Sequence, residues 1–329
     1  MRVNLSEEAM KMRMGTRMKK TFSIVLKTVG VIAIAIGLFL AIVGIVNVIC
    51  NKSEQGKIAS YGQLVPVDGK NMNVFIQGKG EETVVLLPGF GTAAPALDFK
   101  PLVDELSPFY KVVVIEPFGY GLSDETDKER NTANMVSEIH EALQSLKIDR
   151  FILMGHSIAG IYGLDYVNKY KNEVSAFVGI DSSVPTQGGM DVEFPLETFK
   201  LLKKSGLLRM IVKLNGDPYA SLPFDDTTKE QMRMIANKNM NNATTLNEMK
   251  HISSNFKEAQ NLTMPKNLPV MFFLQANNTG VKNWIPLHEE QVKDSVHAKV
   301  MTFEAGHYVH HTKSKEIAEN FRKYMQEIK

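Results

Sequence analysis

The sequence has one cysteine, one tryptophan and almost no net charge. With a single cysteine among 329 residues, the chain cannot form an internal disulfide or a zinc site built from several cysteines, which excludes a disulfide-rich secreted scaffold. A formal net charge of +2 is small for a protein that binds phosphates through clustered lysine and arginine, so we expect no nucleic-acid partner. Hydrophobic residues make up 44% of the chain, which excludes disorder and is enough for a sizeable core.

The positive charge that the chain does carry is gathered near its N-terminus. Residues 1–27 contain seven basic and two acidic residues, a net of +5, and the rest of the chain has a net of −3. Residues 28–50 (TVGVIAIAIGLFLAIVGIVNVIC) then form a run of 23 residues without a charge. A helix of that length crosses a hydrocarbon layer of about 30 Å. We therefore expect a transmembrane helix at 28–50 that anchors the protein in a lipid bilayer.

The flanking charge predicts the orientation of this anchor. Basic segments beside a transmembrane helix stay in the cytoplasm, so residues 1–27 are expected to be cytoplasmic and residues 51–329 extracytoplasmic, as in a single-pass signal-anchor protein. A buried core helix is one alternative, although such helices are usually shorter or carry a polar stripe. A cleaved signal peptide is another, but its apolar core would span only about 7–15 residues. A lipoprotein signal at Cys50 would have a small residue where Ile49 stands.

Beyond residue 50 the sequence alternates short apolar runs with amphipathic segments. Residues 63–67 and 73–77 flank Asp68-Gly69, a dipeptide typical of a hairpin turn, and Pro66 favours a strand at the edge of a sheet. Later runs have the length and the β-branched composition of strands buried on both faces of a parallel sheet: 83–87, 111–115, 151–154, 176–180, 270–275 and 299–303. Helical periodicity occurs between them, as in 132–146 and 315–328. The alternation predicts an α/β domain over 51–329 with a mainly parallel sheet flanked by helices.

One segment interrupts this alternation. Residues 186–266 are mostly helical in pattern and rich in methionine and leucine, as in FPLETFKLLKKSGLLRMIVKL. The segment lies between two predicted strands, so we interpret it as a helical cap inserted into the sheet domain.

A sharp turn that carries a serine follows the strand at 151–154. The residues are Gly155-His156-Ser157-Ile158-Ala159-Gly160, and a helical pattern begins directly after them. A serine on a strained strand-to-helix turn needs small neighbours, because the backbone folds sharply and the helix packs against the strand. The pattern is G-x-S-x-A in place of G-x-S-x-G, and alanine is small enough to serve. Ser157 is therefore a candidate nucleophile.

Together with three further motifs, this turn resembles the α/β-hydrolase fold superfamily, in particular its serine esterase and lipase-like members. Residues 86–91 (LLPGFG) resemble the oxyanion loop, with Pro88 where many members have histidine. Residues 116–124 (EPFGYGLSD) resemble the D-x-P-G-x-G-x-S-D loop, with glutamate in its first position and phenylalanine in its third. His307 follows the last predicted strand, where the family carries its catalytic histidine. The resemblance covers residues from about 57 to the end and excludes the N-terminal anchor.

The resemblance implies a role for each of these residues. A serine hydroxyl becomes an effective nucleophile only when a neighbouring base removes its proton, and His307 is the expected base. The backbone N–H groups of Phe90 and Ile158 are expected to form the oxyanion hole. A Ser-His-Asp triad of this kind works through an acyl-enzyme intermediate, with no metal and no organic cofactor implied.

Other histidines compete with His307 for the role of base. His156 lies within the serine turn, where its side chain is expected to point away from the path of the nucleophile. His310 and His311 raise the possibility of a metal site with His307, but no acidic cluster accompanies them in the sequence. The remaining four lie in segments without a strand-end signature and are expected to be surface or packing residues: His140, His251, His288 and His297.

The sequence leaves several choices for the acid of the triad. Many family members carry it after the strand before last, where this chain reads ANNTG and has no carboxylate until Glu289. Some relatives place it one strand earlier, and there Asp181 follows the run at 176–180, so Asp181 is our predicted acid. A carboxylate that only binds its own loop is the alternative reading of that position. The other candidates are two neutral acceptors and two carboxylates whose family counterparts fix loops: Asn277, Asn278, Glu116 and Asp124.

The nucleophile narrows the range of functions that the resemblance allows. Dehalogenases and epoxide hydrolases of this fold attack with aspartate, so Ser157 argues against both. Serine members include esterases, lipases, thioesterases, amidases, C–C bond hydrolases, cofactor-free haloperoxidases and acyltransferases. The methionine- and leucine-rich insertion near a bilayer favours a small-molecule carboxylic ester with an apolar acyl group. The alternative is a non-catalytic ligand-binding or signalling protein that keeps the fold, which the absence of a carboxylate after 270–275 supports.

Overall fold

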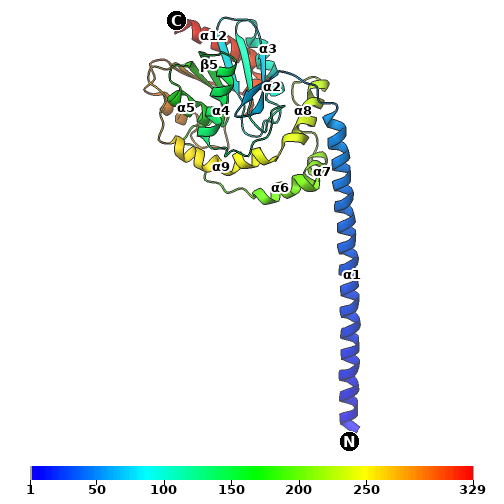
Figure 1. The fold of residues 1–329 in the computed structure, drawn as a ribbon. Coiled ribbons are helices and arrows are strands. Elements are labelled where there is room, and N and C mark those ends of the chain that lie inside the picture. The colour runs from blue at the N-terminus through cyan, green and yellow to red at the C-terminus, as the bar shows by residue number, and fades with distance from the viewer. Residues whose placement is uncertain (1, 329) are drawn as a thin grey trace.

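A long helix extends from a folded domain in the computed structural model (Figure 1). The structure describes residues 2–328, except for the side chains of residues 2–9 and 11. Met1 and Lys329, the outer ends of the predicted segments 1–27 and 51–329, lie outside the described residues. Helix α1 (Arg2–Gln55) includes the predicted span 28–50 and continues past it on both sides.

Part of α1 has the length and composition of a membrane span. The stretch Met12–Gln55 is long and apolar enough to cross a membrane, and its apolar window is not buried against the domain. The core helix of a soluble protein would be mostly buried, so that alternative does not describe α1. A helix near an N-terminus that meets these criteria of length and composition can also belong to a signal sequence, so membrane anchoring by α1 is a proposal.

The described strands form one eight-stranded sheet in the order β1-β2-β4-β3-β5-β6-β7-β8. The first two strands form a hairpin, in which Asp68 and Gly69 have φ angles of 47° and 73°, as a two-residue turn requires. The hairpin joins β4 in the antiparallel sense, and all other pairings are parallel. This confirms the predicted mainly parallel α/β-hydrolase sheet. The strands are β1 (Gln63–Val67), β2 (Lys70–Gln77), β3 (Thr83–Leu87), β4 (Lys111–Glu116), β5 (Phe151–His156), β6 (Val174–Ile180), β7 (Val270–Gln275) and β8 (Ala298–Phe303).

Helices cover both faces of the sheet. Successive residues of each strand point to opposite faces, so Val85 and Leu87 join one core cluster and Val84 and Leu86 join the other. The first cluster includes residues of α4 (Thr132–Ser145), α5 (Ala159–Lys169) and α10 (Trp284–Val292). The second includes residues of α2 (Pro95–Asp98), α3 (Lys100–Leu106), α11 (Val309–Thr312) and α12 (Ser314–Glu327).

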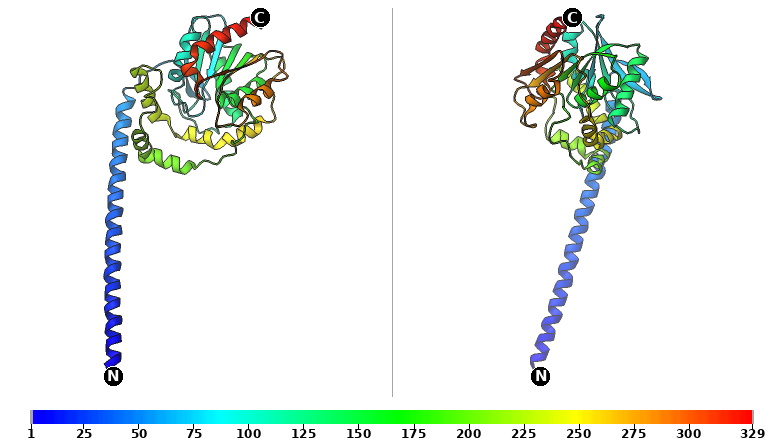
Figure 2. Two further views of the ribbon diagram at one scale, coloured as in Figure 1. Left: turned by 180° about the vertical axis from the view of Figure 1, so that it is seen from behind. Right: turned by 90° about the vertical axis from the view of Figure 1, so that its left-hand side faces the viewer.

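Four helices lie between β6 and β7, within the segment 186–266 that was predicted to be a cap. They are α6 (Leu196–Ser205), α7 (Leu207–Leu214), α8 (Asp226–Asn239) and α9 (Ala243–Ala259). Helix α9 also contributes Ile252 and Phe256 to the first core cluster. The views in Figure 2 place α6 and α7 on the side of the domain from which α1 extends.

Candidate active site

Three predicted site residues follow three strands of the parallel part of the sheet. Ser157 comes directly after β5, Asp181 directly after β6, and His307 four residues after β8. Parallel strands end at the same edge of a sheet, and ligands of α/β sheets bind at that carboxyl edge. The topology therefore gathers residues that lie up to 150 positions apart in the sequence.

These three side chains form a chain of two hydrogen bonds. The Ser157 Oγ lies 2.9 Å from His307 Nε2, and His307 Nδ1 lies 2.7 Å from Asp181 Oδ2. With the proton on Nδ1, the imidazole donates to Asp181 and its Nε2 is free to accept from the serine hydroxyl. The structure thus brings the three predicted residues into the geometry of a nucleophile, a base and an orienting acid. Their catalytic roles remain a prediction.

The backbone at Ser157 is strained and tightly held. Its φ is 55°, a left-handed value that is uncommon for a residue other than glycine. Its carbonyl accepts from Ser183 N at 2.7 Å. The adjacent Gly160 cannot be larger, because a Cβ there would lie 2.2 Å from the Ser183 carbonyl oxygen. These contacts explain the small residues of the motif and hold the serine at the tip of the turn.

Asp181 is buried, and four groups bond to its carboxylate. Oδ1 accepts from the Trp284 indole N–H at 2.8 Å and from Gln275 N at 3.0 Å. Oδ2 accepts from the Gln275 side-chain amide at 2.6 Å in addition to His307. Neither Gln275 nor Trp284 was predicted from the sequence as a partner of Asp181. Gln275 ends a predicted strand beside that of Asp181, which was a usable signal, whereas nothing in the sequence pointed to Trp284.

The two neutral candidates for the triad acid form hydrogen bonds with groups other than His307. The Asn277 side-chain amide donates to Glu304 at 2.9 Å. The Asn278 side-chain oxygen accepts from Gly280 N and Val281 N, both at 2.8 Å. Both side chains therefore organise their own loop.

The two other carboxylates also fix loops. Asp124 accepts from Asn71 N at 2.8 Å. Glu116 is fully buried, and burial raises the pKa of its carboxyl group although several hydrogen bonds oppose this. Its donors are two side chains and two backbone amides: Tyr61, Asn73, Ala96 and Leu122.

The predicted oxyanion donors lie on the loops that flank Ser157. Within the described part of the chain, the backbone N–H groups of Phe90 and Ile158 have no hydrogen-bond acceptor. Gly89 packs against the nucleophile so closely that a Cβ on it would lie 2.9 Å from Ser157 Cβ. The oxyanion loop therefore runs directly beside the nucleophile, and α5 begins directly after Ile158. Free N–H groups at this place suit a negative oxygen that forms next to the serine.

Two neighbouring cavities open beside this loop. One has a volume of about 220 Å³ and is lined by Phe90, Tyr120 and Met249 among others. The other has a volume of about 260 Å³ and is lined by residues that include Thr92 and Tyr308. Gly91, Ala93 and Met240 line both cavities, so the two adjoin across the oxyanion loop and the connection between α8 and α9.

The buried histidines beside the site hold backbone groups. His156 directs its Nε2 to the carbonyl oxygen of His307, 3.1 Å away, and its ring lies 4.7 Å from the His307 ring, centroid to centroid. Burial lowers the pKa of His156 well below its usual value. The two ring nitrogens of His288 lie 2.7 and 2.8 Å from the carbonyl oxygens of Ser182 and Trp284.

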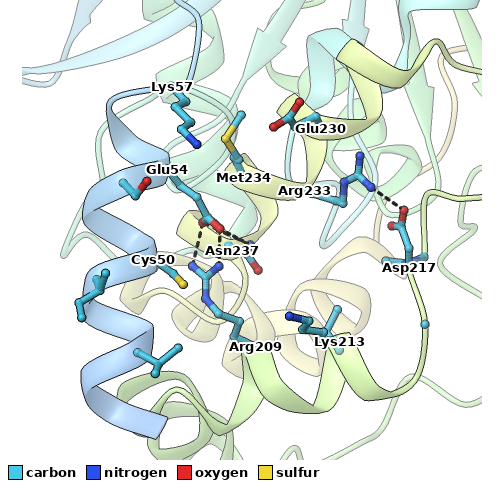
Figure 3. Close-up of a pocket in the computed structure, with 16 residues that line it drawn as sticks. Cys50, Glu54, Lys57, Arg209, Lys213, Asp217, Glu230, Arg233, Met234 and Asn237 are labelled. Atoms are coloured by element: carbon cyan, nitrogen blue, oxygen red, sulfur yellow. Dashed lines mark hydrogen bonds and ion pairs between the residues drawn. The ribbon is translucent and has the colours of Figure 1, made fainter. Parts of the chain in front are cut away.

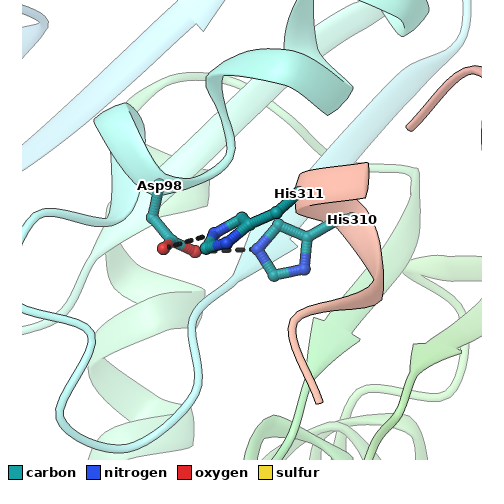
Figure 4. Close-up of side chains that lie close together, drawn as sticks. All are labelled: Asp98, His310 and His311. Atoms are coloured by element: carbon teal, nitrogen blue, oxygen red, sulfur yellow. Dashed lines mark hydrogen bonds and ion pairs between the residues drawn. The ribbon is translucent and has the colours of Figure 1, made fainter. Parts of the chain in front are cut away.

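His310 and His311 share one acidic partner that their place in the sequence did not reveal. Asp98, at the end of α2, lies between them, with each His Nε2 2.8 Å from a carboxylate oxygen (Figure 4). The three side chains are buried and are of the types that ligate metals. Burial raises the pKa of Asp98, but the hydrogen bonds from the two histidines outweigh burial and bring it below its usual range. These two hydrogen bonds connect α2 to α11.

Comparison with known proteins identifies one fold family for this chain. A family model described as the alpha/beta hydrolase fold matches residues 82–314. The chain is 32% identical to the uncharacterized protein YbdG of Bacillus subtilis over 227 residues, which cover 66% of this chain and 70% of YbdG. It is 35% identical to the Karrikin insensitive 2 receptor CA of Petunia hybrida over 96 residues, 28% of this chain and only 35% of that receptor.

A solved structure supports the same architecture. A mutant epoxide hydrolase from Bacillus megaterium, in complex with its product, superimposes with a TM-score of 0.63. The match covers 80% of this chain and all of that one, at 18% sequence identity. At this level of identity the match shows a shared fold and nothing about a shared reaction.

Proposed function

We propose that this chain, which belongs to the alpha/beta hydrolase fold family, is a membrane-anchored serine hydrolase that cleaves a carboxylic ester or a related acyl substrate. The observation that carries the proposal is the hydrogen-bonded chain from Ser157 through His307 to Asp181. The serine lies at the tip of a strained turn, within reach of its base. A serine there suits acyl transfer rather than the aspartate-based chemistry of dehalogenases and epoxide hydrolases.

The geometry supports a two-step reaction. In the first step Ser157 Oγ attacks the substrate carbonyl carbon while His307 Nε2 takes its proton, and the carbonyl oxygen becomes an oxyanion that the N–H groups of Phe90 and Ile158 bind. The bond to the leaving alcohol then breaks, and His307 returns the proton to that alcohol. In the second step water attacks the acyl-serine, His307 takes a proton from the water, and the acid leaves as Ser157 is restored. Asp181 accepts the hydrogen bond from His307 Nδ1 and stabilises the imidazolium.

The cavity beside the oxyanion loop supports an apolar acyl group. Phe90, Met240 and Met249 line it, and methionine side chains adapt to irregular apolar ligands. At about 220 Å³ it is smaller than the range of about 300–1,000 Å³ typical of ligand sites. The adjoining cavity of about 260 Å³ extends the space toward Tyr308. Short to medium acyl chains are therefore the proposed substrates.

Helix α1 is proposed to cross the bilayer with residues 28–50 in the hydrocarbon. Its exposed apolar side chains and the basic segment that precedes them support a cytoplasmic N-terminus and an extracytoplasmic hydrolase domain. Protease treatment of intact cells tests this orientation. We expect cleavage of the hydrolase domain before lysis. Cleavage only after lysis would show that the domain lies in the cytoplasm.

Labelling of the full chain in membranes with a fluorophosphonate probe tests the activity. We expect strong labelling of the unaltered chain, none of Ser157→Ala, and a large decrease with Asp181→Asn. Ser254→Ala, a change of an exposed serine on α9, is the matched control and should label fully. p-Nitrophenyl esters of increasing acyl length then measure the size of the pocket. Full labelling of Ser157→Ala would show that another residue is the nucleophile.

The similarity to the Petunia receptor favours a second candidate, a ligand-binding or signalling protein that keeps the same site. The match covers only about a third of that receptor, so it bears on a part of the fold. The carboxylate missing after β7 is less of an argument for this candidate, because Asp181 bonds to His307 from β6. Well-folded protein that neither labels nor hydrolyses any ester of the series would favour it.

A further inference from the structure

One arginine of the cap binds the end of α1. Arg209 of α7 donates to Asn47, Asn51 and Glu54, which lie at spacings of four and three residues and so share one face of α1. Its distance to Glu54 Oε2 is 2.8 Å, and the side chains of this ion pair are largely buried. Figure 3 shows the bonds between Arg209 and Glu54, which both line a pocket of about 690 Å³ between α1 and the segment 186–266. The cap is therefore held at a fixed height along α1.

The corner between α6 and α7 packs directly on the apolar run of α1. Gly206 forms this corner with φ +80°, and a Cβ there would lie 2.6 Å from Asn47 Cβ and 3.1 Å from the Val43 carbonyl oxygen. At 1.5 Å per residue, Asn47 lies about 29 Å along the helix from Thr28, close to the thickness of a hydrocarbon layer. If residues 28–50 of α1 span the bilayer, the α6–α7 corner lies beside the outer end of this span, close to the boundary of the hydrocarbon.

The surface of α6 and α7 has the composition of an interfacial element. Neither helix has a buried residue. Leu201 and Leu214 are 64% and 76% exposed. Residues 196–214 contain five basic residues and one acidic residue. Apolar side chains next to lysine and arginine on an exposed helix are typical of segments that lie in the headgroup region of a membrane that contains anionic lipid.

We propose that α6 and α7 form a second membrane contact, lying in the outer interface of the bilayer with Leu201 and Leu214 among the lipid chains and the side chains of Lys200, Lys204 and Lys213 among the headgroups. Figures 1 and 2 show both helices on the side of the domain that faces along α1. The occupant of this surface is the lipid bilayer itself. The inference rests on the proposed membrane span of α1, and it places the proposed cap, whose Met240 and Met249 line the cavity beside the oxyanion loop, on the membrane surface.

Depth-dependent quenching on the full chain in lipid nanodiscs tests this. An environment-sensitive NBD label is attached to a single cysteine in each of four variants, all made in a Cys50→Ser background. The variants are Leu201→Cys, Leu214→Cys, Phe39→Cys and Val296→Cys. Phe39 lies within the proposed span, and Val296, which is 66% exposed, precedes β8 at the opposite edge of the sheet. Phosphatidylcholine discs, with and without phosphatidylglycerol, carry a nitroxide either near the headgroup or at mid-chain.

We expect headgroup nitroxide to quench labels at 201 and 214 severalfold more than the label at 296, and mid-chain nitroxide to quench the label at 39. Loss of quenching at 39 would overturn the span of α1 itself. If the label at 39 is quenched but the labels at 201 and 214 are quenched no more than the label at 296, the membrane contact of α6 and α7 is overturned while the span of α1 stands. Labels at 201 and 214 that are blue-shifted but not quenched by lipid would show that a second protein surface covers them, which also overturns it.

Charge reversal provides an independent check. A triple variant with Lys200→Glu, Lys204→Glu and Lys213→Glu should show severalfold less quenching at position 214 in discs with phosphatidylglycerol. Added salt should have the same effect on the chain with its lysines unchanged. Three other exposed lysines serve as the matched control, changed together to glutamate: Lys266, Lys282 and Lys323. Equal effects of the two triple variants would contradict a specific contact between α6–α7 and the lipid surface.

Discussion

Glu248 on cap helix α9 accepts a hydrogen bond from the phenol of Tyr120, with 2.7 Å between the two oxygens. The Tyr120 oxygen in turn accepts from the backbone N–H of Gly91, in the oxyanion loop, at 3.3 Å. Tyr162 on α5 donates to the other carboxylate oxygen of Glu248 at 2.7 Å. All three side chains are buried. Helix α9 is therefore joined by a buried chain of hydrogen bonds to the loop of Phe90 and to the helix that follows Ser157.

Tyr120→Phe should affect both stability and catalysis. The change leaves the Gly91 N–H without its acceptor and one Glu248 oxygen without its donor, which costs about 1–3 kcal/mol of unfolding free energy. It also loosens the oxyanion loop, so kcat for p-nitrophenyl esters should fall. Tyr162→Phe is the matched control, because it removes the same kind of bond from Glu248 and leaves Gly91 paired. Equal losses of kcat in the two variants would show that the link to the loop has no role in catalysis.

Trp284→Phe should weaken the support of the triad acid. The change removes the indole N–H that Asp181 Oδ1 accepts and keeps an aromatic ring in place. Since a hydrogen bond to a charged group contributes about 1.5–3 kcal/mol, we expect kcat/KM for an ester to fall about tenfold or more, with KM little changed. Glu289→Gln, an exposed change on the same helix, should leave kcat/KM as it is. An unchanged kcat/KM in Trp284→Phe would contradict a positioning role for the indole.

The contribution of His156 to the stability of the domain should decrease as the pH falls below about 6.5. Burial lowers the pKa of His156 well below 6.5, so the unfolded chain binds a proton there that the folded chain refuses. The contribution of His156 is therefore complete above about pH 6.5 and decreases as the pH drops from there. The free energy of unfolding by urea, measured from about pH 7 to about pH 5, checks this.

A histidine variant separates this effect from general acid denaturation. His156→Gln should make the dependence of the unfolding free energy on pH shallower in that range, whatever its effect on absolute stability. His297→Gln, at an exposed position, should leave the slope unchanged. A slope in His156→Gln equal to that of the unaltered chain would contradict a neutral, buried His156.

Gly121→Ala should be far more costly than an alanine at another glycine with positive φ. A Cβ at Gly121 would lie 1.8 Å from a carboxylate oxygen of the buried Glu116. Displacing that carboxylate, together with backbone strain, should cost roughly 3 kcal/mol or more. Gly69→Ala shares a positive φ but has nothing within 4 Å of its Cβ position, so only the strain of about 1–2 kcal/mol applies. Urea unfolding of both variants gives the comparison, and similar losses would contradict the steric argument.

The positions of Ser157, Asp181 and His307 were predictable because each follows a strand that its apolar run identifies. Once the sheet is parallel, residues after the strand ends meet at one edge, and no side-chain detail is needed. The donors to Asp181 depend on such detail. Gln275 lies 94 residues from Asp181 and Trp284 lies 103 residues away, and each reaches the carboxylate only through the packing of β6, β7 and α10.

Two other features show where sequence patterns stop being informative. Asp98 is 212 residues from His310, so the carboxylate between the two histidines was missed because the packing of α2 against α11 is not encoded in local spacing. The end of α1 at Gln55 was also not predicted. Hydropathy reports which residues suit hydrocarbon, whereas a helix ends where its hydrogen bonding does, and residues 1–55 contain no proline to end it earlier.

The indole that supports Asp181 has an optical consequence. Trp284 is the only tryptophan of the chain, and its N–H is bonded to the carboxylate that also holds His307. All intrinsic tryptophan emission therefore originates one hydrogen bond away from the proposed catalytic acid. Occupation of the pocket, acylation of the serine and ionisation of the imidazole each alter the field around that ring, so these events are open to stopped-flow fluorescence on unlabelled protein.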